Sequence, residues 1–269
     1  MSSFLSSEEA TPALVARLRA AGCVFAEDEA ELILATARTP DEVEAMAERR
    51  VSGQPLEHVL GWAEFCGVRL TVEPGVFVPR PRTGFLIGQA VALAGELPGT
   101  PVVLDLCCGT GAMGAALVAG LARPVELHAA DLDPAAVRCA RRNLPGASVH
   151  QGDLYEPLPA TLRGRVDLLI ASPPYVPSAS VGLLPPEARL YEPLTALDGG
   201  HDGLDVVRRV IAGAPGWLAP GGHLLIETSE RQAEATARAA EEAGLTVRVT
   251  GSDELDATAV IATAPPSSS

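Results

Sequence analysis

The stretch Val102-Val-Leu-Asp105-Leu-Cys-Cys-Gly109-Thr-Gly111 decides the fold, because an apolar run ends here in a carboxylate and a glycine turn. Residues 102–107 have the composition of a buried strand, and residues 112–121 have that of a helix. Glycines at a strand-to-helix turn let a ligand approach the backbone, and the helix N-terminus behind them supplies N–H donors. The stretch therefore predicts a ligand-binding turn at the carboxyl end of a strand.

Strand-like and helix-like runs alternate on both sides of this turn, from about residue 83 onward. We expect strands at 102–107, 125–132, 148–153, 166–172 and 223–228, and helices at 112–121, 134–143, 204–212 and 231–243. Such alternation predicts an α/β fold with a parallel, doubly wound sheet. The runs 245–250 and 257–263 have no helix between them, which predicts a terminal antiparallel pair.

The chain before residue 83 has a different pattern. Three helical runs, which begin near Ser7, Asp28 and Pro40, predict a small N-terminal helical bundle. Apolar residues interleaved with Gly and Pro predict a β-hairpin linker after it. We therefore expect a helical domain (1–58), a linker (59–82), an α/β domain (83–264) and a disordered tail (265–269).

The charge balance argues against a nucleic-acid partner. The 34 acidic residues outnumber the 20 basic ones, all of which are Arg, so the net charge is −14. A nucleic-acid-binding protein is expected to carry a basic surface instead.

Cysteine and histidine usage indicates a cytoplasmic protein without a metal site. The five Cys form no CxxC pair, and the five His have no metal-ligand spacing, so we expect reduced thiols and no metal. No run of 18 apolar residues predicts a membrane span. Residues 1–10 lack a basic start followed by an apolar stretch, so we expect no secretory signal.

The residues around the glycine turn favour S-adenosylmethionine over a dinucleotide. Gly114 completes a GxGxxG pattern that suits either ligand. Asp105, however, would repel a pyrophosphate, whereas it suits the α-amino group and sulfonium of S-adenosylmethionine. Asp131, at the end of the second strand, can bind both ribose hydroxyls of either ligand.

Two further aspartates follow the second and third strands. Asp133 precedes Pro134 and is expected to cap a helix. Asp153 ends the third strand, where its carboxylate can accept a hydrogen bond from an adenine amino group. The expected cofactor site comprises Asp105, Cys107, Gly109, Gly111, Asp131, Leu132, Asp153, Leu154 and Ser172.

Ser172-Pro173-Pro174-Tyr175 follows the fourth strand and predicts the site of chemistry. Proline fixes a rigid turn and has no N–H, so carbonyl groups near Pro173 are free to accept hydrogen bonds from a planar –NH₂ nucleophile. Tyr175 offers a ring face to a flat substrate group. We expect Ser172, Pro173 and Tyr175 to be catalytic and to bind the substrate together with Pro174. Arg80 is expected either to contact the substrate or to form a salt bridge.

With these motifs the chain resembles the HemK-type protein-(glutamine-N5) methyltransferases, which modify release factors. The resemblance also includes Arg49-Arg50-Val-Ser-Gly53, Val78-Pro79-Arg80-Pro81, and Tyr191-Glu192-Pro193 followed by Leu197-Asp198-Gly199-Gly200 and Asp202-Gly203-Leu204. It implies a seven-stranded Rossmann-like class I methyltransferase domain behind a substrate-recognition bundle. It also implies metal-free methyl transfer from S-adenosylmethionine to a glutamine amide in the Gly-Gly-Gln loop of a release factor.

Two departures from the family pattern indicate a divergent branch. Ser172 stands where the family has Asn, and Arg80-Pro81-Arg82-Thr83-Gly84 replaces the usual Arg-Pro-Glu-Thr-Glu. Ser-Pro-Pro-Tyr also resembles the motif of DNA cytosine-N4 methyltransferases, so a DNA amino-methyltransferase is an alternative hypothesis for the function. A module that binds S-adenosylmethionine without turnover is a third hypothesis. Glu227, at the end of another strand, is expected either to line the site or to be solvated.

Overall fold

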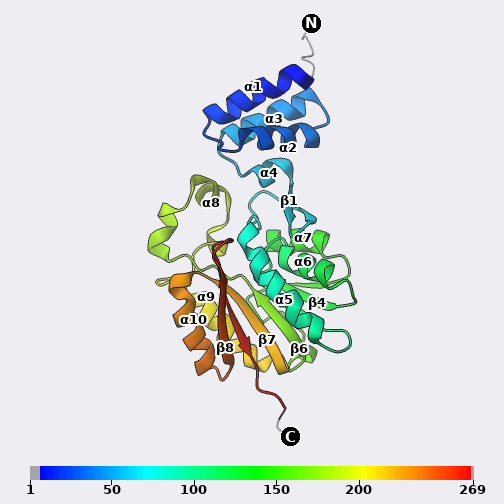
Figure 1. Ribbon diagram of the computed structural model, residues 1–269, viewed down its shortest axis with the longest axis vertical. Helices are drawn as coiled ribbons and strands as arrows, with labels where there is room; N and C mark the ends of the chain where they lie inside the picture. The colour runs from blue at the N-terminus through cyan, green and yellow to red at the C-terminus, as the bar shows by residue number, and fades with distance from the viewer. Residues whose placement is uncertain (1–6, 268–269) are drawn as a thin grey trace.

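A seven-stranded sheet forms the centre of the larger part of the molecule in the computed structural model, which describes residues 7–267 (Figure 1). The strand order is β5-β4-β3-β6-β7-β9-β8, and β9 alone runs antiparallel to its neighbours. The strands are β3 (Val102–Leu106), β4 (Glu126–Asp131), β5 (Ser148–Gln151), β6 (Val166–Ala171), β7 (Leu218–Thr228), β8 (Thr246–Ser252) and β9 (Ala257–Thr263). The expected α/β fold and the terminal antiparallel pair are confirmed.

The strand order reverses at β3, and this reversal places the ligand site. β3 pairs with β4 on one side and with β6 on the other, so Asp105 stands beside Ala129 and Ile170. In open α/β sheets, ligands bind outside the carboxyl ends of the strands at such a reversal. The glycine turn follows β3 at this point.

Helices cover both faces of the sheet. Val103, Leu168 and Ile170 face one side with α5 (Gly84–Glu96), α6 (Ala112–Leu121) and α7 (Pro134–Asn143). Leu104 and Leu169 face the other side with α9 (Asp205–Gly213) and α10 (Glu230–Glu242). The sequence did not predict α5, because its three glycines and its apolar residues on several sides hide the helical period.

The N-terminal helices have a core of their own. Side chains of α1 (Ser7–Ala20), α2 (Ala26–Thr36) and α3 (Pro40–Val51) meet at Leu18, Ile33 and Ala47. As expected from Pro40, this proline begins a helix, which Thr39 caps by accepting a hydrogen bond from the Glu42 amide. The short helix α4 (Leu56–Leu60) follows without having been predicted.

The hairpin of β1 (Trp62–Phe65) and β2 (Val68–Thr71) joins the two parts of the molecule. Phe65 and Leu70 are buried in the same core as α5 and α6, so the hairpin is fixed to the α/β part. Residues 1–6 belong to the segment that is expected to hold no secretory signal, and they lie outside the described residues. Residues 268–269 of the expected tail also lie outside them. Pro265 accepts a hydrogen bond from Gly221.

A long connection between β6 and α9 lies between the helical bundle and the sheet (Figure 1). It contains η3 (Ser178–Leu183), α8 (Pro186–Tyr191) and η4 (Leu194–Ala196). The Tyr191 hydroxyl donates to the carbonyl of Ser52, and Arg50 of α3 forms an ion pair with Glu187 of α8. The bundle is therefore tied to this connection. Within residues 7–267, none of the helices has the length and apolarity needed to cross a membrane.

Candidate active site

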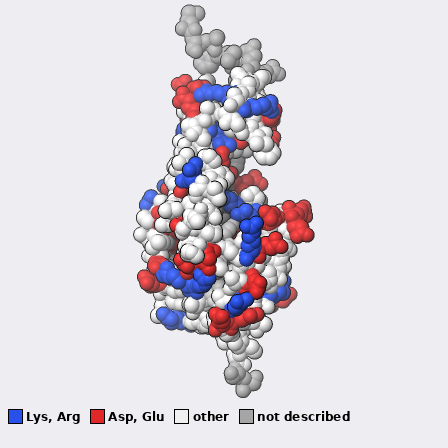
Figure 2. Space-filling model, turned by 90° about the vertical axis from the view of Figure 1, so that its left-hand side faces the viewer, with Lys and Arg blue, Asp and Glu red and all other residues white. Residues whose placement is uncertain are grey.

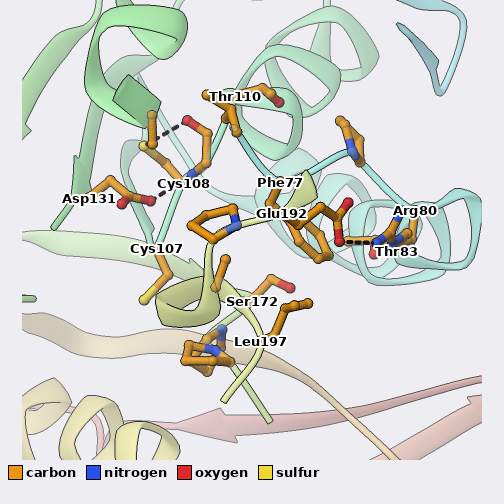
Figure 3. Close-up of a pocket in the computed structure, with 18 of the residues that line it drawn as sticks. Phe77, Arg80, Thr83, Cys107, Cys108, Thr110, Asp131, Ser172, Glu192 and Leu197 are labelled. Atoms are coloured by element: carbon orange, nitrogen blue, oxygen red, sulfur yellow. Dashed lines mark hydrogen bonds and ion pairs between the residues drawn. The ribbon is translucent and has the colours of Figure 1, made fainter. Parts of the chain in front are cut away.

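A cavity of about 780 Å³ opens at the carboxyl ends of β3, β4 and β6. Figure 3 shows Cys107 and Asp131 on one side of it, Phe77, Arg80 and Glu192 on the other, and Ser172 between them. We call the first side the cofactor half and the second the substrate half. The cofactor half is lined by residues 107–110, 112–113, 130–133, 136 and 153–154. The substrate half is lined by residues 77, 79–83, 172–176, 184–185, 187–188, 192–193 and 195–197.

The glycine turn and Asp131 form the cofactor half. Cys107, Gly109 and Gly111 all have positive φ, so the turn is a sharp one. Oδ2 of Asp131 accepts a hydrogen bond from the Gly109 amide at 2.8 Å, and Oδ1 accepts one from the Asp133 amide at 2.9 Å. Burial raises the pKa of Asp131 despite these bonds. Its carboxylate lies in the cavity wall, where the sequence predicted the ribose contact.

Asp105 lies behind the turn rather than in the cavity wall. It is fully buried, its Oδ2 accepts from the Gly114 amide at 2.9 Å, and its Oδ1 has no hydrogen-bond partner. Burial raises its pKa to about 7. Gly111 is also absent from the wall and packs on Leu144. The structure thus separates these two residues from the other expected cofactor residues.

Asp153 and Leu154 line the edge of the cofactor half beyond β5. The Asp153 carboxylate pairs with Arg209 at 2.7 Å, and both side chains are partly exposed. Asp133 caps α7 as predicted, by accepting from the Ala135 amide at 2.7 Å. Burial raises the pKa of the Cys107 thiol, which keeps it protonated and argues against a nucleophile.

The Ser172-Pro173-Pro174-Tyr175 turn lines the cavity and contacts Glu227 at the end of β7. The Ser172 and Tyr175 hydroxyls each lie 3.5 Å from a carboxylate oxygen of Glu227. Thr83 donates to the same carboxylate at 2.6 Å, and Nε of Arg82 lies 3.3 Å from it. Burial raises the pKa of Tyr175, so its hydroxyl keeps its proton.

Glu227 is the principal residue that the sequence left undecided. It is only 5% exposed, so it is not solvated. The register β6–β7 pairs Ala171 with Ile226, which places Glu227 beside Ser172 at the same edge of the sheet. The sequence signal for Glu227 as a site residue was its position at the end of a strand. The sequence does not state, however, that this strand is the neighbour of β6.

Arg80 forms a salt bridge and also lines the cavity. Its Nη2 lies 2.5 Å from Oε2 of Glu192, and its guanidinium lies over the Phe77 ring. Glu192 is buried and also accepts from the Val78 amide at 3.1 Å. Of the two expectations for Arg80, the salt bridge is confirmed, and the substrate contact stays a prediction.

Two glycines of the 191–204 stretch let it approach the Ser172–Tyr175 turn closely. A Cβ at Gly199 would lie 2.7 Å from the Pro174 carbonyl oxygen, and one at Gly203 would lie 2.3 Å from that of Tyr175. Such distances are shorter than any normal contact, so only glycine fits at both positions without rearrangement. This stretch therefore fixes the turn from behind.

The residues present fit S-adenosylmethionine. Asp131 offers carboxylate oxygens to a ribose, Gly109 brings bare backbone to the cavity, and the buried Oδ1 of Asp105 leaves an acceptor without a partner beneath the turn. The carboxyl group of Asp105 beneath the turn disfavours the pyrophosphate of a dinucleotide, which would be bound at this position. Within residues 7–267, no group of three or more His, Cys, Asp or Glu is placed to hold a metal ion.

Comparisons with known proteins agree with this fit. Residues 69–183 match the methyltransferase small domain family. A crystal structure of a methyltransferase from Pyrococcus furiosus superposes with a TM-score of 0.55 at 17% identity, covering 74% of this chain and 90% of that chain. The fold and the site define a class I methyltransferase that uses S-adenosylmethionine.

Curated relatives identify the family. A release factor glutamine methyltransferase from Geobacter sulfurreducens is 39% identical over 202 residues, which cover 72% of this chain and 69% of the relative. One from Mycolicibacterium smegmatis is 39% identical over 237 residues, covering 84% and 82%. The chain belongs to the release factor glutamine methyltransferase family.

Proposed function

We propose that this chain transfers a methyl group from S-adenosylmethionine to the side-chain amide nitrogen (N5) of a glutamine in the Gly-Gly-Gln loop of a peptide chain release factor. The observation that carries this is the Ser172–Tyr175 turn, which meets the cofactor half in one cavity and has no N–H on its two prolines. The carbonyl groups of this turn are therefore free to accept hydrogen bonds from an amide NH₂ group. The names of the family members support a release factor as the partner.

In this proposal the cofactor half holds the methyl donor. Asp131 binds the ribose hydroxyls, and Asp153 and Leu154 lie at the adenine end. The Gly109 backbone and Leu132 line the remainder of the cofactor site. S-adenosylmethionine supplies an electrophilic methyl group on its sulfonium.

The substrate half aims the amide nitrogen. The Ser172 oxygen and the carbonyl groups around Pro173 accept its two N–H bonds, while the Tyr175 ring lies against the amide plane. The nitrogen attacks the methyl carbon directly, and the methylated amide then releases its proton to solvent. The protein contributes orientation and exclusion of water rather than a strong base.

The N-terminal bundle is proposed to dock the release factor. Pro55 and Glu57, which follow α3, line the cavity, so a protein bound to the bundle would lie next to the opening of the site. The proposed substrate places the enzyme in the cytoplasm. Arg and acidic side chains are interspersed over the face in Figure 2, which suits a protein partner better than a nucleic acid.

The test is methyl transfer from labelled S-adenosylmethionine to a full-length release factor and, in parallel, to duplex DNA. We expect label on the Gly-Gly-Gln glutamine, located by mass spectrometry of the digested product, and none on DNA. Ser172→Ala is expected to lower kcat/KM at least tenfold, because one acceptor for the amide is lost. Label on DNA alone would select the amino-methyltransferase reading. No label on either, from a preparation that binds S-adenosylhomocysteine, would indicate a binding module.

A further inference from the structure

The substrate half provides many acceptors for an amide but few donors. A glutamine side chain presents an NH₂ group, which needs acceptors, and a carbonyl oxygen, which needs a donor. The hydroxyl groups of Ser172 and Tyr175 both direct their hydrogen toward the buried Glu227 carboxylate, at 3.5 Å each. Thr83 also donates to Glu227. These three hydroxyls therefore offer only lone pairs to a substrate, and the two prolines offer no N–H.

Three arginines line the cavity and are the cationic donors available there. Arg209 pairs with Asp153 at the cofactor end, and Arg80 pairs with Glu192 over the Phe77 ring. Arg82 is the one that contacts the Ser172–Tyr175 turn directly, because its Nη2 donates to the Tyr175 hydroxyl at 2.6 Å.

The Arg82 guanidinium is held in place with donors to spare. Its Nε lies 3.3 Å from Glu227, and its Nη2 is bound to Tyr175, whereas its Nη1 makes no hydrogen bond within residues 7–267. The side chain is 44% exposed, so a substrate entering the cavity can reach it. Desolvation opposes the charge of Arg82, but Tyr175 and Glu227 outweigh it and raise its pKa, so the guanidinium stays protonated.

We propose that Nη1 of Arg82 donates to the side-chain carbonyl oxygen of the substrate glutamine, leaving the amide NH₂ to Ser172 and the carbonyl groups of the turn. This proposal rests on the proposed function. Arg82 thereby distinguishes a glutamine amide from groups that lack a carbonyl oxygen, and Glu227 balances its charge.

The chemistry predicts an effect on binding rather than on turnover. A cation on the carbonyl oxygen draws electron density from the amide nitrogen, which must attack the methyl carbon. Arg82 therefore stabilises the bound substrate at least as much as the transition state, and its loss should raise KM without lowering kcat.

The experiment measures steady-state kinetics at saturating S-adenosylmethionine, with the release factor varied. The enzymes are the wild type, Arg82→Gln, Arg82→Lys and the control Arg238→Gln, which replaces an exposed arginine of α10. We expect Arg82→Gln to raise KM by about tenfold or more, as for a hydrogen bond to a charged group, with kcat unchanged. Arg82→Lys keeps the charge opposite Glu227, so its KM should lie between those of the wild type and Arg82→Gln. The KM and kcat of the control should match those of the wild type.

A second probe reports on the same contact without turnover. A release factor with glutamate in place of the target glutamine presents a carboxylate to the same donors, so it should inhibit the wild type competitively. We expect its inhibition constant to rise by about tenfold or more in Arg82→Gln, because a charge-assisted bond is lost. Binding of S-adenosylhomocysteine to each variant checks that the cofactor half is intact.

The outcomes separate this inference from the proposed function. If the wild type methylates the release factor and Arg82→Gln leaves both KM and the inhibition constant unchanged, the Arg82 contact is wrong and the proposed function stands. A loss of kcat with unchanged KM would likewise overturn the contact. If the wild type places no methyl on the release factor, the proposed function fails and the contact falls with it.

Discussion

The two halves of the cavity are held together in different ways. The cofactor half depends on a backbone turn and on one carboxylate, Asp131, which binds two amides within 22 positions of it. The substrate half depends on side-chain pairs that are far apart in sequence: Arg82 and Glu227 are 145 positions apart, and Arg80 and Glu192 are 112 apart. The first half is a local structure, whereas the second exists only after the whole chain has folded.

This difference predicts separable defects. Changes in the distant supports of the substrate half should weaken stability or turnover while cofactor binding persists. Changes in the local turn should weaken cofactor binding first.

The most remote support is the Arg50 ion pair, and its loss should have the largest effect. Arg50 pairs with Glu29 at 2.6 Å, where both side chains are 10% exposed, and also with Glu187 of α8, which lines the cavity. Arg50→Met leaves the Glu29 carboxylate buried without a partner. We expect the free energy of unfolding, measured by urea denaturation, to fall by about 3–5 kcal/mol.

The matched control replaces both partners. Glu29→Leu combined with Arg50→Met removes the buried charge altogether, and apolar replacements of buried ion pairs are often neutral, so most of the stability should return. Glu187→Gln affects a half-exposed partner and should cost about 1 kcal/mol or less. A single Arg50→Met variant as stable as the wild type would show that this pair does not support the substrate half.

Gly203 supports the substrate half from behind. Its φ is +81°, and a Cβ there would lie 2.3 Å from the Tyr175 carbonyl oxygen and 2.4 Å from Nε2 of Gln232. Gly203→Ala should therefore displace the Ser172–Tyr175 turn and lower kcat/KM about 100-fold, because orientation is the main contribution to the rate. Calorimetric titration should show S-adenosylhomocysteine bound within about threefold of the wild type.

Gly182→Ala is the matched control for this change, because a Cβ at Gly182 meets nothing within 4 Å. It should retain wild-type kinetics. If Gly203→Ala lowers cofactor affinity as much as kcat/KM, the two halves are not separable in the way the contacts indicate.

The same difference explains what the sequence could predict. The glycine turn, Asp131 and the Asp133 cap are local patterns, and the strands that carry them have the expected order along the chain. Asp105 was placed at the right strand end, but its burial behind the turn depends on how Gly114 packs. No local pattern states that a side chain at such a position lies beneath the backbone rather than above it.

The substrate half could be predicted only in part. Ser172–Tyr175 was visible as a motif, whereas the partnership of Glu227 with Arg82 and Thr83 depends on β7 lying next to β6 and on α5 following the 77–83 segment. Helix α5 itself was missed for want of a clear period. Pairings between distant segments are tertiary facts, which composition and spacing do not encode.

Asp131 tests the cofactor half directly. Asp131→Asn removes the charge and turns an NH₂ group toward either the Gly109 or the Asp133 amide, each of which is itself a donor. We expect the affinity for S-adenosylhomocysteine to fall by about tenfold or more in calorimetric titration. Asp133→Ala removes the cap of α7 and should cost about 1 kcal/mol of stability. Asp133 also lines the cavity, so we expect a loss of affinity that is smaller than that of Asp131→Asn. Equal affinities of Asp131→Asn and wild type would remove Asp131 from the site.

Asp105 in the cofactor half should give a signal of a different kind, a pH dependence of stability. Burial raises its pKa from 3.8 to about 7 in the folded protein, so between these values the folded state binds a proton that the unfolded state has released. Raising the pH through this window therefore destabilises the protein, by up to about 1.4 kcal/mol per pH unit, and the cost is fully present above pH 7. Asp105→Asn has no such proton, so its melting temperature relative to the wild type should rise from pH 4 to pH 7 and then level off.

The quantity to follow is the difference in melting temperature between Asp105→Asn and the wild type, because other carboxylates titrate in both proteins and their effects cancel. A difference in melting temperature that does not change with pH would mean that Asp105 is ionised across the whole window. Titration with S-adenosylhomocysteine at pH 8 then separates the two roles of this residue. If Asp105 acts through the turn on the amino group of the ligand, Asp105→Asn binds more weakly although it is more stable. If Asp105 only fixes the start of α6 through Gly114, the affinity stays the same and the gain in stability stands alone.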